Sequence, residues 1–373
     1  MVISKNQLHI VSFDVPYPPN YGGVIDVFYK LKALFDLGIE IYFHTFEYGR
    51  GRPKELDELC KYIFYYPRNS SITNVLFKTP YIVKSRSNEE LIKNLKRIKA
   101  PVLFEGLHTT SPLIMENFED RKVLVRAHNI EHLYYAGLAK SENRIDKKIF
   151  FKTEAKKLRA YESILDKADT ILTISPSEHD YFRNRYIGNA VYIPVFHPNN
   201  KVKKLSKKGD FALYHGDLRV ADNIKAVHFL IDIFKQLDYE LVIASSFINK
   251  TIINEISIHE KMRFVKIENQ NQLQDLFEKT HINVLPTFQK TGIKLKLINT
   301  LFNGRFCLVT SKMVEDTGLE KLCEIGRTKE EFTQKVYELI HTDYVDDLVK
   351  EREKVLKPFN IYENAQKIID LLF

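Results

Sequence analysis

The sequence predicts an α/β protein built from two doubly wound parallel sheets. Short apolar runs alternate with segments of helical periodicity along the chain, which is typical of parallel strands joined by crossover helices. A lysine-rich stretch, 201–208, interrupts this alternation, which then starts again. The 373 residues are too many for one ordinary core and about right for two domains.

The first half begins with an apolar run at 8–13, which we interpret as a strand. A turn at 16–23 leads into a helix, because Val24, Val27, Leu31 and Leu34 recur at helical spacing. Gly38 ends this helix. Further strands are predicted at 39–46, 102–104, 123–125 and 170–174, with helical stretches such as 146–167 between them.

A capping box predicts the start of another helix. Ser175 and Glu178 have the spacing of that motif, and Pro176 suits a first helical position. In the second half, strands are predicted at 211–214, 241–244, 264–267, 282–285 and 306–309. A last helix, 362–373, lies beyond this pattern, and the periodicity leaves open on which half it packs. Ligands of such sheets bind at the carboxyl ends of strands, so two facing sheets predict an interdomain cleft.

Composition limits the class of protein. Hydrophobic residues make up 44% and charged residues 28%, as in soluble globular proteins. The N-terminus enters a strand without a signal-peptide pattern, so we expect a cytoplasmic protein. The net charge of +8 arises mainly from 84–99, 140–167 and 201–208, which lack the aromatic interleaving of nucleic-acid binders. Nucleic acid is therefore not expected, and a solvated surface or peripheral contact with an anionic inner membrane face stays open.

The segment 286–304 predicts a phosphate site. An apolar strand ends at a proline, a glycine-centred turn follows, and a helix then begins with Lys294 and Lys296 in its first turn. The positive end of a helix dipole, backbone amides and two ammonium groups together favour a phosphate or diphosphate.

Other strand ends also carry polar residues or glycines. The first strand is followed by Gly22 and Gly23, and the first strand of the second half by Gly216 and Arg219. The strands at 102–104 and 123–125 are followed by a cluster of polar residues, which we interpret as part of a catalytic site. The cluster consists of Glu105, His108, Arg126 and Asn129 around His128. A histidine in such a cluster is more often functional than a lone one.

Several chemistries lack their defining residues. The sequence has no dinucleotide-binding glycine motif, no P-loop and no nucleophile elbow. It also has no Asp-x-Asp triplet, the usual clamp for a divalent cation on a diphosphate. We therefore expect neither a cofactor nor a metal, and lysines, arginines and helix ends would have to neutralise a diphosphate.

Five motifs in order resemble the GT-B glycosyltransferases, specifically glycosyltransferase family 4: PYPPNYGG, VLVRAHNIEH, LTISPSEHDYF, YHGDLRVADN and PTFQKTGIKLKLINTLFNG. The resemblance implies two facing Rossmann-like domains, 1–198 on the acceptor side and 199–358 for the nucleotide-sugar, and a helix, 359–373, that crosses back to the first domain. It implies retaining, metal-independent transfer of a hexose-type sugar to a saccharide or lipid-linked glycan acceptor.

By the same resemblance, His128 matches the family's active-site histidine beside the transferred sugar. The resemblance also implies that the residues around it, Glu105, His108, Arg126 and Asn129, lie on the acceptor side. Gly22 and Gly23 match the glycine loop near the donor phosphates. The loop that meets the sugar hydroxyls and phosphate corresponds to Thr291, Gly292, Ile293 and Lys294.

Four positions depart from the family pattern. Thr291 and Asn299 stand where the family has glutamates, and Asp217 and Asn223 stand where it has a phosphate-binding Arg and Lys. We hypothesise that Lys294, Lys296 or both replace the missing cations, with Arg219 as a further candidate. The departures keep two alternatives open: a GT-B binding or partner subunit without catalysis, and a sugar-nucleotide epimerase of the same fold.

Overall fold

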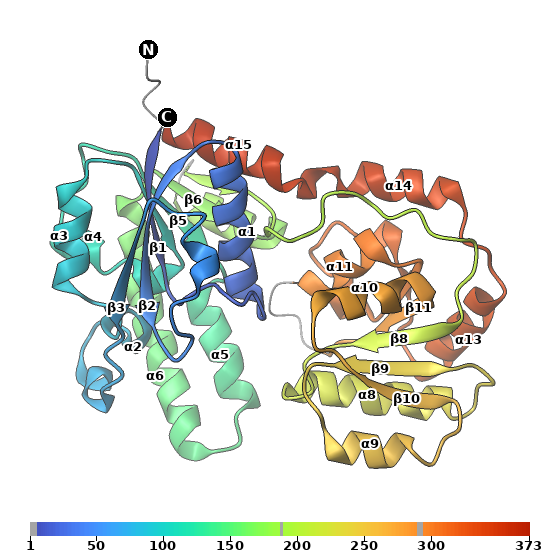
Figure 1. Cartoon of the computed structure of the whole chain (residues 1–373). Helices are drawn as coiled ribbons and strands as arrows, with labels where there is room; N and C mark the ends of the chain where they lie inside the picture. The colour runs from blue at the N-terminus through green and yellow to red at the C-terminus, as the bar shows by residue number, and fades with distance from the viewer. Residues whose placement is uncertain (1–5, 187–188, 289–293) are drawn as a thin grey trace. The chain divides into compact units, whose positions relative to one another are not determined.

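The computed structural model describes residues 6–186, 189–288 and 294–373. The chain forms two compact units: unit 1 is Met1–Pro198 with Pro358–Phe373, and unit 2 is Asn199–Lys357. Each contains a parallel sheet with helices on both faces (Figure 1). The predicted fold class, two doubly wound parallel α/β sheets, is confirmed.

Within the described residues, the sheet of unit 1 has seven parallel strands in the order β3-β2-β1-β4-β5-β6-β7. The strands are β1 (Gln7–Ser12), β2 (Glu40–Glu47), β3 (Tyr62–Pro67), β4 (Val102–Glu105), β5 (Val123–Ala127), β6 (Thr170–Thr173) and β7 (Ala190–Tyr192). The strand order reverses between β1 and β4, and such a reversal is where doubly wound sheets bind ligands.

The helices of unit 1 are α1 (Gly22–Asp36), α2 (Tyr81–Lys84), α3 (Glu89–Arg97), α4 (Pro112–Met115), α5 (Glu131–Ser141), α6 (Ile145–Tyr161), α7 (Pro176–Arg185) and α15 (Ile361–Leu372), with short 3-10 turns η1 (Lys54–Leu56), η2 (Ile72–Leu76), η3 (Leu107–Thr109) and η4 (Glu162–Lys167). The predicted capping box of Ser175 and Glu178 is present at the start of α7.

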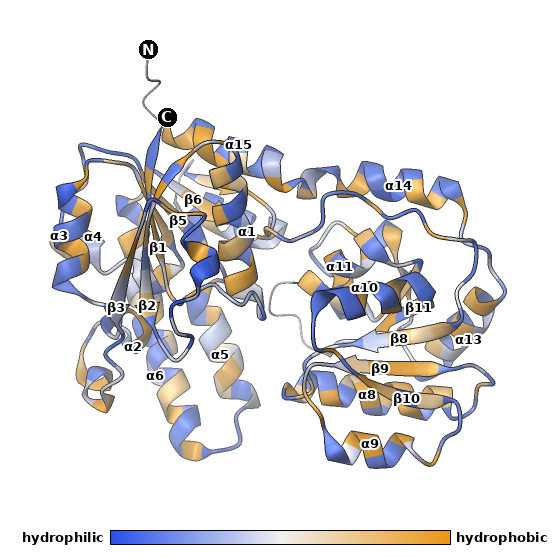
Figure 2. Cartoon of the chain, viewed as in Figure 1, coloured by the Kyte–Doolittle hydropathy of each residue, from blue (hydrophilic) through white to orange (hydrophobic). Residues whose placement is uncertain are grey.

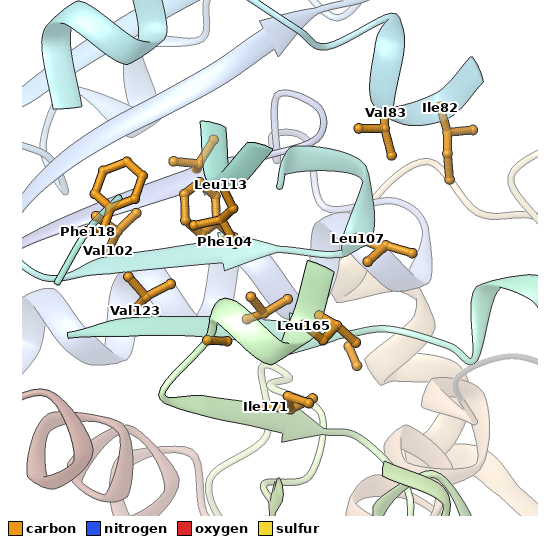
Figure 3. Close-up of a cluster of buried hydrophobic side chains, with 14 of the residues drawn as sticks. Ile82, Val83, Val102, Phe104, Leu107, Leu113, Phe118, Val123, Leu165 and Ile171 are labelled. Carbon is orange, nitrogen blue, oxygen red and sulfur yellow. The ribbon is translucent and has the colours of Figure 1, made fainter. Parts of the chain in front are cut away.

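Successive side chains of each strand enter opposite cores of unit 1, as the strand period of two requires. Val102 and Phe104 of β4 pack in one core with α3 and α7, whereas Leu103 packs in the other with α1. Figure 3 shows part of the first core, in which Phe104 and Phe118 approach edge to face at 6.4 Å. The inner strands β4, β5 and β6 are buried along their whole length because both faces of the sheet are covered. Figure 2 shows hydrophobic residues together with more polar ones along the strands.

The C-terminal helix α15 packs on α1 within unit 1. Ile361, Ala365, Ile368 and Leu372 recur at helical spacing and are buried in the core that α1 shares. The Tyr362 hydroxyl also donates a hydrogen bond to Asp36 at the end of α1 (3.0 Å). The last helix of the chain is thus a structural part of the first sheet's unit.

In the described part of unit 2, the sheet has six parallel strands in the order β10-β9-β8-β11-β12-β13. They are β8 (Phe211–His215), β9 (Leu241–Ser245), β10 (Met262–Lys266), β11 (Thr280–Leu285), β12 (Phe306–Val309) and β13 (Glu324–Ile325). The helices are α8 (Ala221–Phe234), α9 (Lys250–Ile256), α10 (Gln270–Lys279), α11 (Leu295–Asn303), α12 (Ser311–Val314), α13 (Lys329–Ile340) and α14 (Asp346–Leu356), with η5 (Glu320–Leu322) and, at the junction of the units, η6 (Lys357–Phe359). The order reverses between β8 and β11.

The elements that the sequence did not predict are short or lie at a sheet edge. β7 has three residues and β13 two, which is too short to establish a period. β3 was also not predicted; it has six residues but lies at the edge of its sheet, and most of them are only partly buried or are exposed. The predicted helical stretch at 146–167 is divided into α6 and the 3-10 turn η4. No helix of the described residues is long and apolar enough to cross a membrane.

We expect Ile368→Ala to lower the free energy of unfolding of unit 1 by about 2–5 kcal/mol, because it leaves a cavity where α15 packs. Gln366→Ala, an exposed change on the same helix, should be nearly neutral. Urea denaturation of both variants measures the difference. Equal unfolding midpoints would show that α15 contributes little to unit 1.

Candidate active site

The strand reversal of unit 1 brings together residues from β4, β5 and α1. Glu105 is the last residue of β4, Arg126 lies in β5, and His128 follows that strand directly. Asp26 and Lys30 project from α1 toward them, and all five side chains are buried. Three of these residues were predicted from the sequence, and the two on α1 were not.

The five side chains form one network of buried ion pairs. The Lys30 ammonium lies 2.9 Å from Asp26 Oδ2 and 2.7 Å from Glu105 Oε1. The Arg126 guanidinium donates hydrogen bonds to both oxygens of Asp26, from Nη2 to Oδ1 (2.9 Å) and from Nε to Oδ2 (3.1 Å). His128 Nε2 lies 2.9 Å from the other Glu105 oxygen, Oε2. The network therefore joins α1 to two adjacent strands and holds the His128 ring.

Backbone groups bond the remaining polar atoms of Arg126 and Asp26. Arg126 Nη1 donates to the carbonyl of Ile193 (2.6 Å), and Nη2 donates to that of Pro194 (3.1 Å). Asp26 Oδ1 also accepts the N–H of Phe196 (2.8 Å). The guanidinium of Arg126 thus lies entirely inside unit 1, where it positions the segment after β7 and does not reach the surface.

Burial by itself would raise the pKa of Asp26, but the charges of Arg126 and Lys30 outweigh it and hold that pKa well below its ordinary value. The pKa of Glu105 is also lowered, because Lys30 and His128 more than offset its burial. Both groups are carboxylates at neutral pH, so their two charges balance those of Lys30 and Arg126.

Asp26, Glu105 and His128 are also the described residues that could hold a metal ion, since one ligand atom of each lies within 4.8 Å of the others. However, the Lys30 ammonium already bonds an oxygen of each carboxylate. A dication would have to enter beside two fixed cations. The charge balance of this cluster thus fits an internal ion pair better than a metal centre.

His128, His108 and Phe13 surround one small region at the carboxyl edge of the sheet. The Phe13 ring lies 5.3 Å from the His128 ring and 5.6 Å from the His108 ring. A side chain at Gly23 would place its Cβ 2.8 Å from the Phe13 ring, so this aromatic contact requires a glycine there. Gly22 and Gly23 begin α1, whose first turn carries no acidic residue.

Glu131, the first residue of α5, faces the same region. Its Oε1 lies 3.9 Å from His108 Nδ1. Burial raises the pKa of Glu131 to about 8, although hydrogen bonding to Asn129 and the charge of Arg86 partly oppose this. Burial also holds the pKa of His108 well below its ordinary value. At neutral pH this acid and this base are therefore both mainly uncharged.

Three buried polar atoms of these residues lack a hydrogen-bond partner within the part of the chain that the structure describes. They are His108 Nδ1, His128 Nδ1 and Glu131 Oε1. Unpaired buried polar atoms are costly in a protein that only has to fold. Their presence in this region therefore indicates a binding surface for a polar, uncharged group.

In unit 2, Lys296 and Asn223 meet at the strand reversal. The Lys296 ammonium donates to Asn223 Oδ1 (3.0 Å) and lies 5.4 Å from the centre of the Tyr214 ring. Asn223 is fixed in turn, because its Nδ2 donates to the carbonyl of Asp217 (2.9 Å). Within the part of unit 2 that the structure describes, no carboxylate forms a salt bridge with Lys296.

The pKa of Lys296 is lowered to about 8, mainly by burial and also by the charge of Lys294, although the charge of Asp222 partly opposes this. Burial also lowers the pKa of Lys294, which stands at the N-cap of α11. The carboxylate of Asp222 accepts hydrogen bonds from other groups, namely Thr287 Oγ1 (2.6 Å) and the N–H of Phe288. An anion beside Lys296 would therefore stabilise its charged form.

The remaining predicted donor residues have distinct surroundings. Gly216 directly follows β8. Arg219 is largely exposed, pairs with Asp217 (2.7 Å) and stacks on Phe247 at 3.4 Å. Asn299 accepts a hydrogen bond from Asn303 (3.0 Å) inside α11. Thr291, Gly292 and Ile293 lie outside the described residues.

Comparison with known proteins supports the same fold. A Klebsiella pneumoniae protein described as an uncharacterized 44.6 kDa protein in the cps region is 28% identical over 328 residues, 83% of this chain and 84% of that protein. A variant of S. aureus TarM, in complex with Fondaparinux, alpha-GlcNAc-glycerol and UDP, is similar over 99% of both chains at 11% identity and a TM-score of 0.65. The lipopolysaccharide outer core galactosyltransferase WaaB is similar over 98% of this chain and 99% of its own, at 12% identity and a TM-score of 0.61.

The chain has the GT-B glycosyltransferase fold. No family model matches the sequence. At these identities the solved structures establish the architecture alone, so family 4 stays a resemblance and the chemistry must be argued from the site.

The sequence contained a signal for the residues that were missed. Asp26 and Lys30 interrupt the apolar face of α1, where Lys30 lies one turn after Val27 and one turn before Leu34. Two charges four residues apart on a buried face require partners across the core. Glu131 was also not among the predicted site residues, although it lies in the motif VLVRAHNIEH that contains His128.

We expect Lys30→Met to destabilise unit 1 by about 3–5 kcal/mol, because the buried carboxylates of Asp26 and Glu105 would lose the ammonium group that pairs with both. Lys32→Met on the same helix removes an exposed pair with Asp36 and should change stability by less than about 1 kcal/mol. Urea denaturation at neutral pH compares the two. A Lys30→Met variant as stable as Lys32→Met would show that the network contributes little.

Proposed function

We propose that this protein is a retaining, metal-independent glycosyltransferase that moves a hexose-type sugar from a nucleotide-sugar to a hydroxyl of a saccharide or lipid-linked glycan. The observation that carries the proposal is the Lys296 ammonium, which lies at the strand reversal of unit 2 and donates a hydrogen bond to the amide oxygen of Asn223. A half-buried cation without a carboxylate is suited to bind an anion such as a diphosphate.

The contact between Lys296 and Asn223 explains one departure from the family pattern. Asn223 stands where the resemblance implies a phosphate-binding lysine, and Lys296 reaches Asn223 from α11. The cation is thus provided from a position 73 residues further along the chain. Arg219 is a weaker candidate, because Asp217 already neutralises it at the surface.

The proposed chemistry breaks the bond between the anomeric carbon of the donor sugar and the diphosphate oxygen. The acceptor hydroxyl oxygen forms the new bond on the same face, and its proton passes to an oxygen of the departing diphosphate. Lys296, with Lys294 and the amides at the start of α11, would stabilise the charge that develops on the leaving group. No protein nucleophile is assigned.

On the acceptor side, the proposal assigns His128 to the transferred sugar and the pair of His108 and Glu131 to a hydroxyl. Two atoms 3.9 Å apart can both lie within about 2.8 Å of one oxygen. Protonated Glu131 would donate to that oxygen, and neutral His108 would accept its proton. An uncharged hydroxyl suits this region better than an anion does.

The comparisons give independent support. TarM and other solved GT-B structures contain UDP, which is the type of ligand that the unit 2 site would bind. The Klebsiella relative is described as lying in a cps region, which supports a saccharide pathway but does not identify an acceptor.

The first test measures donor binding. A panel of nucleotide-sugars is screened by the shift in melting temperature, and the best ligand is titrated calorimetrically against Lys296→Ala. We expect binding to weaken roughly 10- to 150-fold, the equivalent of one charge-assisted contact. Lys250→Ala, an exposed change on α9, serves as the control. Equal affinity of Lys296→Ala and wild type would refute the role of this lysine.

The second test separates catalysis from binding. His128→Ala should reduce the turnover of sugar transfer, or of donor hydrolysis, roughly 100-fold while donor affinity changes little, because the ring would act on the reacting sugar. His132→Ala is the matched control. The His132 ring forms a hydrogen bond with Glu162 (3.0 Å) and has no contact with Glu105 among the described hydrogen bonds.

Tight nucleotide-sugar binding without transfer or hydrolysis in the wild type would favour a binding or partner subunit. Conversion of the donor to an epimer without an acceptor would favour an epimerase. Unchanged turnover in His128→Ala would remove the assigned role of this histidine.

A further inference from the structure

Unit 1 exposes large apolar side chains on two segments that are distant in sequence. In the segment at η2, Ile72 is 79% exposed, Leu76 83% and Phe77 48%. At the start of α6, Ile145 is 74% exposed and Ile149 59%. Single exposed apolar residues need no explanation, but five on two neighbouring segments do.

Hydrogen bonds and ring contacts place the two segments side by side. Lys157 of α6 donates to the carbonyl of Val75 in η2 (2.7 Å), and Glu154 accepts the N–H of Tyr81 (2.5 Å). The rings of Tyr81 and Phe150 meet edge to face at 6.0 Å. We call the residues 72–78 and 145–156 the docking surface. In Figure 1, the α5–α6 hairpin extends beyond the carboxyl edge of the sheet.

One stripe of α6 combines apolar and basic residues. Ile145, Ile149, Lys152 and Lys156 follow at intervals of four, three and four residues, and all are exposed. This spacing places them on one face of the helix. Lysines beside exposed isoleucines can extend their ammonium groups to phosphate headgroups while their methylenes stay near acyl chains.

The surrounding charge is strongly positive. Residues 140–159 contain eight basic and three acidic side chains, and residues 68–84 contain three basic side chains and no acidic one. A protein partner is disfavoured, because lysines are depleted in protein interfaces. Clustered lysines with interspersed apolar side chains are instead typical of segments that lie on anionic membranes.

We propose that the docking surface binds unit 1 to the surface of a bilayer that contains anionic phospholipids. The isoleucines, Leu76 and Phe77 enter the headgroup region, and Lys152 and Lys156 pair with lipid phosphates. If the proposed glycosyl transfer is correct, this contact favours a lipid-linked acceptor over a soluble saccharide.

The test uses the full chain and vesicles of phosphatidylcholine alone or mixed with phosphatidylglycerol. We expect sedimentation with the anionic vesicles, much weaker binding to the neutral ones, and loss of binding as salt rises. The double change Ile145→Ser and Ile149→Ser should weaken binding roughly tenfold or more. Ile72→Ser with Leu76→Ser tests the second segment in the same way.

Matched controls lie in unit 2. Ile258→Ser removes an isoleucine that is 77% exposed, and Lys250→Gln with Lys279→Gln removes two exposed lysines; none should change vesicle binding. By contrast, Lys152→Gln with Lys156→Gln should weaken it and flatten its salt dependence. Melting curves and nucleotide binding verify that each variant is folded, and neither readout requires sugar transfer.

Three outcomes would overturn the proposal. The first is no binding to anionic vesicles, and the second is equal binding to neutral ones. The third is full binding by both apolar double variants. If those variants instead abolish a concentration-dependent dimer, the surface is an interface between two copies of the chain and not a membrane contact.

Discussion

The buried ion pairs of Asp26, Lys30, Glu105 and Arg126 are the constraint on which unit 1 depends. Four charges inside a protein are tolerated only when each has a partner at hydrogen-bond distance. That requirement fixes the rotation of α1 on the sheet, because Asp26 and Lys30 must both face β4 and β5. It also fixes the His128 ring, because Glu105 uses one oxygen for Lys30 and the other for the histidine. The candidate active site is therefore assembled by the same contacts that hold the core.

A network of this kind is not the most stable way to fill a core, since well-packed apolar side chains often do as well or better. Its advantage here is orientation. An apolar α1 could slide along the sheet at small cost, whereas Lys30 bonds two carboxylates from different elements and Arg126 bonds Asp26 with two nitrogens. The start of α1, where Gly23 lies against Phe13, is placed by these same bonds. The geometry of the β1–α1 loop thus depends on ion pairs that Asp26 and Lys30 make about one and two turns further along the helix.

The sequence predicts the fold well where one residue pattern decides the structure. Strands that are buried on both faces give apolar runs, and β1, β8, β11 and β12 are found within one or two residues of their predicted bounds. Edge strands such as β7 and β13 are too short for such a pattern. Likewise, polar residues after strands indicate Glu105 and His128, but the contact between Lys296 and Asn223 joins segments 73 residues apart. Residue spacing along the chain cannot predict a contact between such distant segments, and the three-dimensional structure is needed to show it.

Burial acts in opposite directions on acids and bases, and this produces a different charge at each candidate site. In unit 1 the positive and negative charges of the ion-pair network balance. Burial raises the pKa of Glu131 to about 8, so this side chain is mainly protonated at neutral pH. Burial lowers the pKa of His108, so its ring is neutral. In unit 2 burial lowers the pKa of Lys296 only to about 8, so at neutral pH the ammonium still carries its charge with an amide as partner. A neutral hydroxyl suits the first environment and a diphosphate the second. The assignment of acceptor and donor in the proposed transfer therefore follows from the electrostatics of each unit, considered separately.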